Sequence, residues 1–423
     1  MSTVIRRARS VVERRLVRNT GWSMVGELGR LFTQITVFVI LTYLYEPDEY
    51  GVLVGALGLL WFIQPYSQLG ATHLLLQRVA GDREDLEEAT ALGLSTVVVG
   101  GVAATVVLLA LQPFVLPQVD PLTLGLLSVS ELIAMAMIEV VAFVAVATER
   151  IRAMALLRTA HGVARAVVAL ILFAVATEPE LWMWALAATL AALVTALIGL
   201  FLLNGSIPKP VVPGRGDLRE GVPLSVGFGA EKIRSSADAF LLVRLDREFD
   251  AGIYGAATRL VNIARIPITA LLHASNARLY AAGASSVREA RDLAARLTTG
   301  AFWLSGATAL VLFVGVDVII DLLPAEYADT AEAVRWLTFL PLSSSLSVFA
   351  GTALTAIRRH GTRVALISTA AAVNIALNIA WIPDHGWKGA AVASFISSGM
   401  YAVSTWFMLL RYAAAEAHRT DRT

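Results

Sequence analysis

Long apolar stretches separated by short polar connections dominate this chain. Twelve of them reach the ~20 mostly apolar residues that a helix needs to cross a bilayer. They lie at 20–45, 51–76, 90–113, 121–147, 154–176, 180–203, 221–243, 251–275, 297–320, 331–356, 362–383 and 388–411. The longest connection, 204–220, is rich in Pro and Gly and leaves no room for a folded soluble domain. The pattern predicts an all-α integral membrane protein with twelve transmembrane helices.

Composition supports this fold class. Hydrophobic residues make up 57% of the chain and charged residues 16%, whereas soluble domains average about 45–50% and about 25%. The net charge of +1 argues against a nucleic-acid-binding protein, because no field of one sign exists to attract phosphate backbones. The absence of cysteine excludes disulfides and thiolate chemistry.

The distribution of basic residues predicts the orientation of the helices. If the N-terminus is cytoplasmic, most of the 34 Lys and Arg residues, Arg363 among them, fall in cytoplasmic segments, and the outside loops hold only Arg244, Arg247 and Lys388. This bias follows the positive-inside rule. We therefore expect a multi-pass protein of the cytoplasmic (inner) membrane with both termini inside. Residues 1–19 are basic and amphipathic, as expected of a helix on the membrane surface, and 412–423 form a cytoplasmic tail.

The two halves of the chain resemble each other. They align at an offset of 204 without gaps through the first two helices of each half, and the Glu-x-x-Arg pattern recurs. The matched pairs are Glu27 with Glu231, Arg30 with Arg234, Gln34 with Asp238, Tyr50 with Tyr254 and Gly51 with Gly255. Because six spans is an even number, the halves enter the membrane from the same side and form a parallel internal repeat. The predicted lobes are 20–203 and 221–411, joined by the linker 204–220.

Ionisable residues inside the predicted spans are the candidate functional residues, because such groups are costly in a membrane and mark sites by default. The first and seventh spans each carry a polar stripe, and the eighth adds a third. Across these three stripes the residues of greatest interest are Glu27, Arg30, Glu231, Arg234, Asp238, Arg259, Asn262 and Arg265. One interpretation is that the Glu-x-x-Arg pairs only neutralise each other and hold helices together. In the second half, however, five basic residues, with Lys232 and Arg335 included, face only Glu231 and Asp238. This positive surplus favours an aqueous cavity that attracts anions.

Small and cyclic residues predict local geometry. Pro65, Pro267 and Pro341 are each expected to kink a helix, because each removes a backbone hydrogen bond. The kinks are either passive bends or a feature that helps the two lobes rock. Gly51, like Gly55 and Gly58, is expected to permit close helix packing.

Enzyme chemistry finds little support in the sequence. The six His residues form no pair with metal-ligand spacing. The Gly-x-Gly at 227–229 lies inside a predicted membrane helix, without the strand that a dinucleotide-binding motif requires. We therefore expect no catalytic activity, no cofactor and no metal site.

Several short segments, in both halves of the chain, resemble segments of one known family. In the first half they are NTGWS at 19–23, PDEYG at 47–51, LGATH at 69–73 and QRVA at 77–80. In the second half Ala237 and Asp238 precede an apolar run and then GIYGAA at 252–257. These segments resemble polysaccharide flippases of the Wzx type, a branch of the superfamily that also holds MATE drug exporters and lipid II flippases. The resemblance covers essentially the whole chain, and twelve spans suits the polysaccharide and MATE branches.

The resemblance implies two helix bundles around a cavity that opens alternately to each side of the membrane. It implies that the substrate is a polyprenyl-diphosphate-linked oligosaccharide, an O-antigen or exopolysaccharide precursor, whose lipid tail stays in the membrane. We expect Arg30, Arg234, Arg259 and Arg265 to contact the diphosphate, with Glu27, Glu231 and Asp238 tuning the field or binding a coupling H⁺ or Na⁺. Glycan polymerase or assembly proteins are further candidate partners.

Three other functions remain open. A major-facilitator transporter also has two six-helix halves, and Gly81, Asp82 and Arg83 lie where that family has a similar loop, but acidic residues follow where its motif is basic. A MATE-like exporter of small cations is disfavoured by the positive balance of the second half. A third possibility is a non-transporting subunit of a glycan assembly complex, such as a polymerase. A polymerase would be expected to need a large outside loop, whereas the outside loops predicted here are short.

Overall fold

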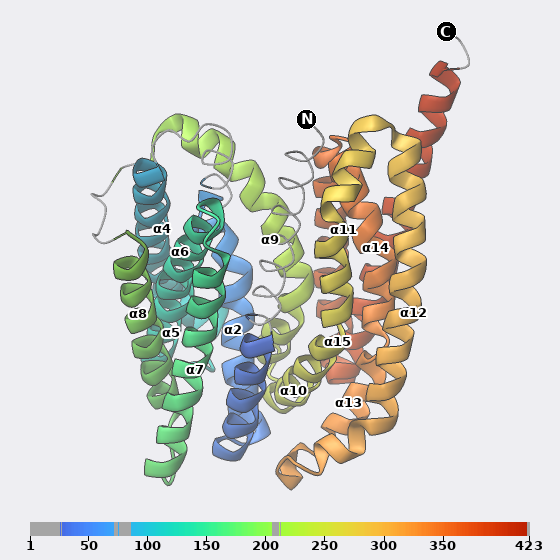
Figure 1. The fold of residues 1–423 in the computed structure, drawn as a ribbon. Coiled ribbons are helices and arrows are strands. Elements are labelled where there is room, and N and C mark those ends of the chain that lie inside the picture. The colour runs from blue at the N-terminus through green and yellow to red at the C-terminus, as the bar shows by residue number, and fades with distance from the viewer. Residues whose placement is uncertain are drawn as a thin grey trace, which may run out of the picture. The chain divides into compact units, whose positions relative to one another are not determined.

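The computed structural model describes residues 26, 28–71, 75, 86–204, 211 and 213–420, and most of these are helical (Figure 1). No strand occurs among them, which agrees with the long apolar stretches of the sequence. Glu27 and the predicted surface segment 1–19 lie outside the described residues. The last helix continues to Thr420, so most of the predicted tail is helical.

Contacts within the chain divide it into two compact units. Unit 1 comprises Met1–Leu44 and Ile63–Ser225, and unit 2 comprises Tyr45–Phe62 and Val226–Thr423. This division differs from the predicted boundary in the 204–220 linker. Most of α2 (Pro47–Ser67) groups with unit 2, and the first residues of α9 (Arg215–Arg244) group with unit 1.

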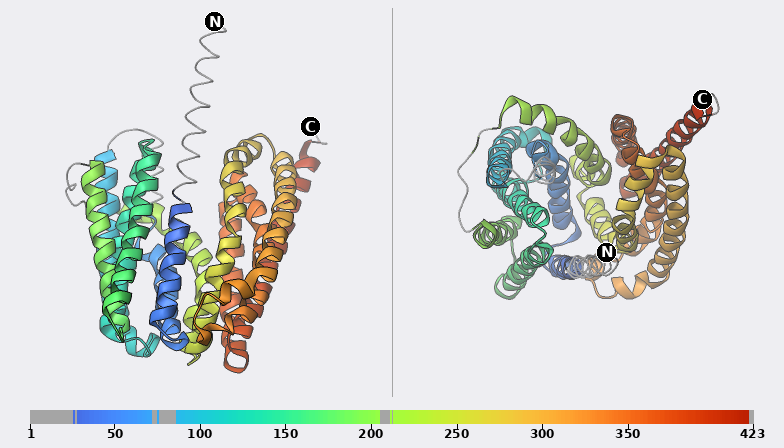
Figure 2. Two further views of the ribbon diagram at one scale, coloured as in Figure 1. Left: turned by 60° about the horizontal axis from the view of Figure 1, so that its bottom comes forward. Right: turned by 45° about the horizontal axis from the view of Figure 1, so that its top comes forward.

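Unit 1 is a bundle of apolar helices, drawn in blue to green in Figure 2. It contains the helix Leu28–Leu44, α4 (Leu86–Val115), α5 (Pro121–Ser128), the π-helix η1 (Val129–Ala134), α6 (Met135–Ala147), α7 (Ile151–Val175) and α8 (Leu181–Asn204). The first of these helices packs tightly on α7, because a Cβ atom on Gly162 would lie 2.1 Å from the Thr33 hydroxyl oxygen. Small residues at such a crossing let two helices approach closely.

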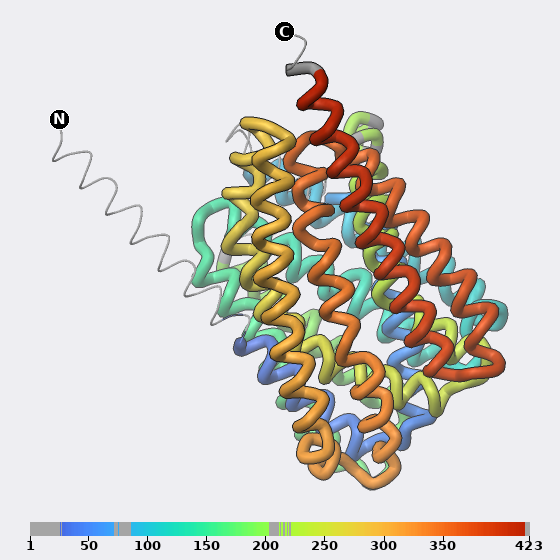
Figure 3. Tube along the Cα trace, turned by 90° about the vertical axis from the view of Figure 1, so that its right-hand side faces the viewer, coloured from blue at the N-terminus to red at the C-terminus, as the bar shows by residue number. Residues whose placement is uncertain are grey.

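Unit 2 contains α10 (Glu248–Ala264), α11 (Ile266–Ser285), α12 (Val287–Ile320), the short η2 (Ala325–Tyr327), α13 (Thr330–Leu337), α14 (Leu340–Ala356) and α15 (His360–Thr420). Helices α12, α14 and α15 run side by side (Figures 1 and 3). Ser286 caps α12 by accepting a hydrogen bond from the Glu289 N–H at 3.0 Å, and Glu416 on α15 accepts from the Val287 and Arg288 N–H groups. These acceptors satisfy amides that a helix start would otherwise leave unpaired.

Seven helices in the described part of the chain are long and apolar enough to cross a membrane, or eight if α13 and α14 form one bent span. Each of the twelve predicted spans overlaps helical structure, but the exact count of twelve stays a prediction. Large apolar side chains on α12 face outward, with Val311, Val314 and Val318 each at least 70% exposed. A water-soluble protein would rarely expose such a surface, and the chain is a multi-pass membrane protein.

Two predicted spans of unit 2 contain breaks. Arg265 ends α10 and precedes α11, where Pro267 occupies the first turn. The axes of α13 and α14 differ by 42°, and Pro341 lies in the first turn of α14. These two prolines therefore start helices after a break, as their missing N–H groups favour, whereas Pro65 lies inside α2.

A further break, at Gly386, lies between the predicted spans 362–383 and 388–411 and turns α15 back on itself. Gly386 has a φ of 54°, which glycine adopts without strain. A Cβ atom there would lie 2.2 Å from a carboxylate oxygen of Asp250. Burial raises the pKa of the Asp250 carboxyl, although the Trp387 N–H and Arg247 act in the opposite direction.

Glycines bring α2 and α10 into direct backbone contact within unit 2, as the sequence predicts for Gly51. A Cβ atom on Gly51 would lie 1.9 Å from the Glu248 carbonyl oxygen, and one on Gly252 would lie 1.9 Å from the Pro47 carbonyl oxygen. The contact is reciprocal, since each helix start presses a glycine against the other backbone. No larger residue fits at either position without moving a helix.

Candidate functional site

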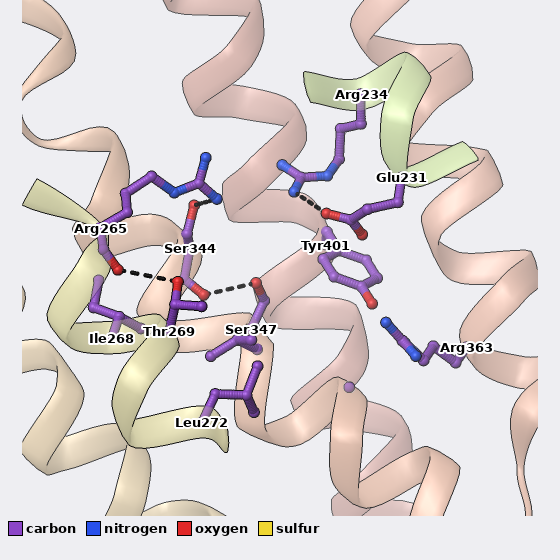
Figure 4. Close-up of a pocket in the computed structure, with 12 residues that line it drawn as sticks. Glu231, Arg234, Arg265, Ile268, Thr269, Leu272, Ser344, Ser347, Arg363 and Tyr401 are labelled. Atoms are coloured by element: carbon purple, nitrogen blue, oxygen red, sulfur yellow. Dashed lines mark hydrogen bonds and ion pairs between the residues drawn. The ribbon is translucent and has the colours of Figure 1, made fainter. Parts of the chain in front are cut away.

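A cavity of about 260 Å³ lies within unit 2 among α9, the α10–α11 break, α14 and α15 (Figure 4). Polar and charged side chains surround it, together with a few apolar ones. The lining residues are Glu231, Arg234, Arg265, Ile268, Thr269, Leu272, Ser344, Ser347, Val348, Gly351, Arg363 and Tyr401. Three of the predicted site residues, Glu231, Arg234 and Arg265, therefore come together here.

Arg234 is the most tightly held cation of this cavity. Its Nη2 donates to Glu231 Oε1 at 2.9 Å, and its Nη1 donates to Ser398 Oγ at 2.9 Å. Its guanidinium carbon lies 5.8 Å from the centre of the Tyr401 ring, within the range of a cation–π interaction. Only 9% of the Arg234 side chain is exposed, compared with 41% for Glu231.

Arg265 reaches the cavity because the helix breaks at this residue. Its Nη2 lies 3.5 Å from Ser344 Oγ, and its Nη1 lies 3.5 Å from Asn262 Oδ1. Both distances are at the long end for hydrogen bonds. The guanidinium is therefore weakly held and has donors available for other acceptors.

Arg363, in the first turn of α15, is a cavity residue that the sequence analysis missed. Its Nη1 lies 3.4 Å from Thr355 Oγ1, and the guanidinium lies beside the Tyr401 hydroxyl. The sequence analysis grouped this arginine with the basic residues that flank the membrane. Its place inside the predicted span 362–383 was the available signal.

The cavity thus carries three guanidinium groups and one carboxylate. Arg234, Arg363 and Arg265 all lie close enough to Glu231 to act on it electrostatically. Guanidinium groups bind carboxylate and phosphate oxygens through paired N–H donors. With the lining hydroxyls added, the cavity is suited to a polyvalent oxyanion.

Asp238 lies outside this cavity in a second polar cluster. It is only 3% exposed and accepts hydrogen bonds from the Tyr254 hydroxyl at 2.7 Å, from Asn378 Nδ2 at 2.7 Å and from the Ser394 hydroxyl. Asn374 and Asn378 are fully buried, and within the described residues their Oδ1 atoms accept no hydrogen bond. Buried acceptors without partners are unusual and call for an explanation.

The remaining predicted site residues lie elsewhere. Arg259 is directed toward the buried Tyr50 hydroxyl at the start of α2, and the exposed Asn262 contacts Arg265 outside the lining. Arg30 is exposed and belongs to unit 1, and Glu27 lies outside the described residues.

Two cations counted in the positive surplus of the second half do not contribute to the cavity. Arg335 donates to the Asp317 carboxylate at 2.6 and 2.7 Å. Lys232 is exposed and does not line the cavity. The surplus of positive charge at the cavity is therefore smaller than the sequence suggested. Arg363 contributes to it, whereas Arg335 and Lys232 do not.

Solved structures with the same fold are transporters. The chain matches an inward-facing multidrug resistance MATE family transporter of the MOP superfamily with a TM-score of 0.75 and 15% identity, covering 92% of this chain and 94% of that one. The outward-facing conformation of a transporter of this kind matches with a TM-score of 0.69 and 14% identity, at 95% and 96% coverage. A MOP superfamily transporter from Pyrococcus furiosus, described as having a binding pocket of reverse polarity that suggests a different function, matches at 0.61 and 12%, at 95% and 96% coverage.

The fold is therefore that of the MATE-type membrane transporters. Residues 16–275 match the model of the polysaccharide biosynthesis protein family, and the chain belongs to this family. No curated protein matches the chain. Family and fold are those of membrane transporters and flippases and not of enzymes.

Proposed function

We propose that this protein carries a polyprenyl-diphosphate-linked oligosaccharide, of the O-antigen or exopolysaccharide type, across the cytoplasmic membrane by alternating access. The observation that carries the proposal is the cavity of unit 2, where Arg234, Arg265 and Arg363 outnumber the single carboxylate of Glu231. A diphosphate joined to a lipid and a sugar carries two negative charges, and this cavity has a net charge of matching size and opposite sign. Membership of the polysaccharide biosynthesis family supports a glycan precursor as the class of substrate.

The cavity suits the head group of such a substrate better than the whole molecule. A charged diphosphate cannot cross hydrocarbon without compensation, and paired guanidinium donors provide that compensation. The volume of about 260 Å³ is slightly below the ~300–1,000 Å³ of pockets that enclose drug-sized ligands. We infer that the cavity takes the diphosphate, while most of the glycan and the lipid tail lie outside it.

The Asp238 cluster is the proposed site of a coupling ion, H⁺ or Na⁺. Its carboxylate and the Oδ1 atoms of Asn374 and Asn378, which accept no hydrogen bond within the described residues, would supply three oxygen ligands in a buried location. Hard cations prefer such ligands. A proton on Asp238 would neutralise the same buried charge. Comparing transport driven by a proton gradient with transport driven by a sodium gradient distinguishes the two ions.

The proposed setting is the inner membrane with both termini in the cytoplasm, which the distribution of arginine supports. Glycan polymerase and assembly proteins are the proposed protein partners. They would receive the substrate on the far side of the membrane.

The direct test is flipping of a lipid-linked oligosaccharide in reconstituted vesicles. Arg234→Glu should abolish flipping while leaving membrane insertion intact, because it replaces the best-held guanidinium with a carboxylate that repels the diphosphate. Arg244→Glu is the matched control, since Arg244 is exposed at the last turn of the same helix. Unchanged flipping by Arg234→Glu would refute the assignment.

Deletion of the gene gives a second test in the cell. Lipid extracts should then contain a polyprenyl-linked oligosaccharide on the cytoplasmic side. Normal flipping without this protein would indicate a non-transporting assembly subunit instead.

Export of small molecules is the alternative function, favoured by the likeness to the MATE fold. The excess of guanidinium groups in the cavity opposes a cationic drug as substrate. A drug efflux assay with the same Arg234→Glu variant decides between flipping and drug export. If the protein exports cations, removal of this positive charge should improve their export.

A further inference from the structure

The guanidinium of Arg234 uses only half of its binding edge. Its Nε and Nη2 point to the same side, and this edge can hold two oxygens of one carboxylate or phosphate. Nη2 donates to one oxygen of Glu231 at 2.9 Å. Nε is buried and has no hydrogen-bond partner among the described residues. The edge therefore retains an unused donor beside a singly bound carboxylate.

The two partners of this ion pair are held very differently. Arg234 is fixed from other sides, by Ser398 at 2.9 Å and by the Tyr401 ring, and 9% of its side chain is exposed. The Glu231 side chain is 41% exposed and accepts a hydrogen bond from Arg234. Glu231 can therefore swing into the cavity while the guanidinium stays in position.

An incoming phosphate and the Glu231 carboxylate require the same donors. A phosphate with two oxygens would pair with Nε and Nη2 together, and so gains one hydrogen bond that Glu231 does not make. The carboxylate, once displaced, remains close to Arg265 and Arg363 and continues to repel the bound anion. Replacement of Glu231 by phosphate on Arg234 is thus favourable, but the free energy gained is only the difference between the two interactions.

We propose that Glu231 is a built-in competitor for the oxyanion. It occupies the Arg234 edge in the empty cavity, gives way to the phosphate group of the substrate and returns to expel it. The proposal rests on the proposed function, because it requires a phosphate-bearing substrate. A carrier benefits from such a competitor, since three unopposed guanidinium groups would hold a diphosphate too tightly to release it.

Binding of inorganic pyrophosphate to the purified full-length protein in nanodiscs of zwitterionic lipid tests the proposal. Glu231→Gln should bind pyrophosphate about tenfold to a hundredfold more tightly than the unmodified protein, because it loses one competing charge-assisted hydrogen bond. Glu332→Gln is the matched control, because Glu332 pairs with Lys388 outside the cavity, and its affinity should not change. Glu231→Ala gives the same expectation if the glutamine variant fails to fold.

Flipping supplies the second measurement. Glu231→Gln should flip lipid-linked oligosaccharide more slowly than the unmodified protein, with retention of the head group as the cause. Pyrophosphate binding that depends on Arg234 but is equal or weaker in Glu231→Gln would overturn the competitor role and leave the proposed function standing. Absence of pyrophosphate binding in every variant would overturn the proposed function and the competitor with it.

Discussion

The hydrogen bond from Tyr254 to Asp238 offers a quantitative test of the buried cluster in unit 2. The donor and acceptor oxygens are 2.7 Å apart, and both side chains are buried, with 4% and 3% exposed. A hydrogen bond to a charged group contributes about 1.5–3 kcal/mol, and one between neutral groups about 0.5–1.5 kcal/mol. Tyr254→Phe should therefore destabilise the protein by about 1.5–3 kcal/mol if Asp238 is ionised.

A double-mutant cycle separates the charge from the packing. In an Asp238→Asn background, Tyr254→Phe should cost only about 0.5–1.5 kcal/mol, so the coupling energy should be on the order of 1 kcal/mol. Reversible unfolding of the four proteins in mixed micelles measures these differences. Tyr280→Phe, at a 48% exposed tyrosine of α11, is the control and should have little effect. Equal costs of Tyr254→Phe in both backgrounds would refute an ionised, hydrogen-bonded Asp238.

Three further predictions concern other parts of unit 2. Gly252→Leu should prevent stable folding, because even its Cβ atom would lie 1.9 Å from the Pro47 carbonyl oxygen; a monodisperse, active variant would contradict this. Asp250→Asn should raise the melting temperature at pH 7, because the raised pKa of Asp250 makes its ionisation unfavourable in the folded state. That gain should disappear as the pH falls toward its unfolded pKa of about 3.9, and a pH-independent gain would argue against it. Arg335→Gln should leave flipping within about twofold of normal, since Arg335 pairs with Asp317 away from the cavity; a large loss would place it in the transport path.

Most of the helical architecture could be predicted from the sequence, because membrane helices are recognisable from the length and hydrophobicity of their apolar stretches. The prediction was weakest where one span consists of several pieces. The π-helix η1 inside the fourth span and the separate helices α10 and α11 leave the hydropathy pattern unchanged. Apolar periodicity reports which residues can enter the membrane and not where backbone hydrogen bonds change partners.

The candidate site could be predicted only in part. Glu231, Arg234 and Arg265 stand out as charges within apolar stretches. Arg363 lies so near the end of its span that charge counting assigned it to the membrane surface. Asn374 is a polar residue within the predicted span 362–383. Its place beside Asp238 depends on how α15 packs against α9, and one sequence contains no signal for that contact.

The faces that α9 and α15 present to each other have a consequence for energy transduction. Arg234 and Asp238 are four residues apart on α9, and their hydrogen-bond partners Ser398 and Ser394 are four residues apart on α15. Each pair spans one turn, so both sites rest on the same two rigid elements. A ligand that shifts one helix against the other at Asp238 also changes the geometry at Arg234. For the proposed ion site at Asp238 and the proposed phosphate site at Arg234, thermodynamic reciprocity requires that the factor by which the ion changes phosphate affinity equals the factor by which phosphate changes affinity for the ion.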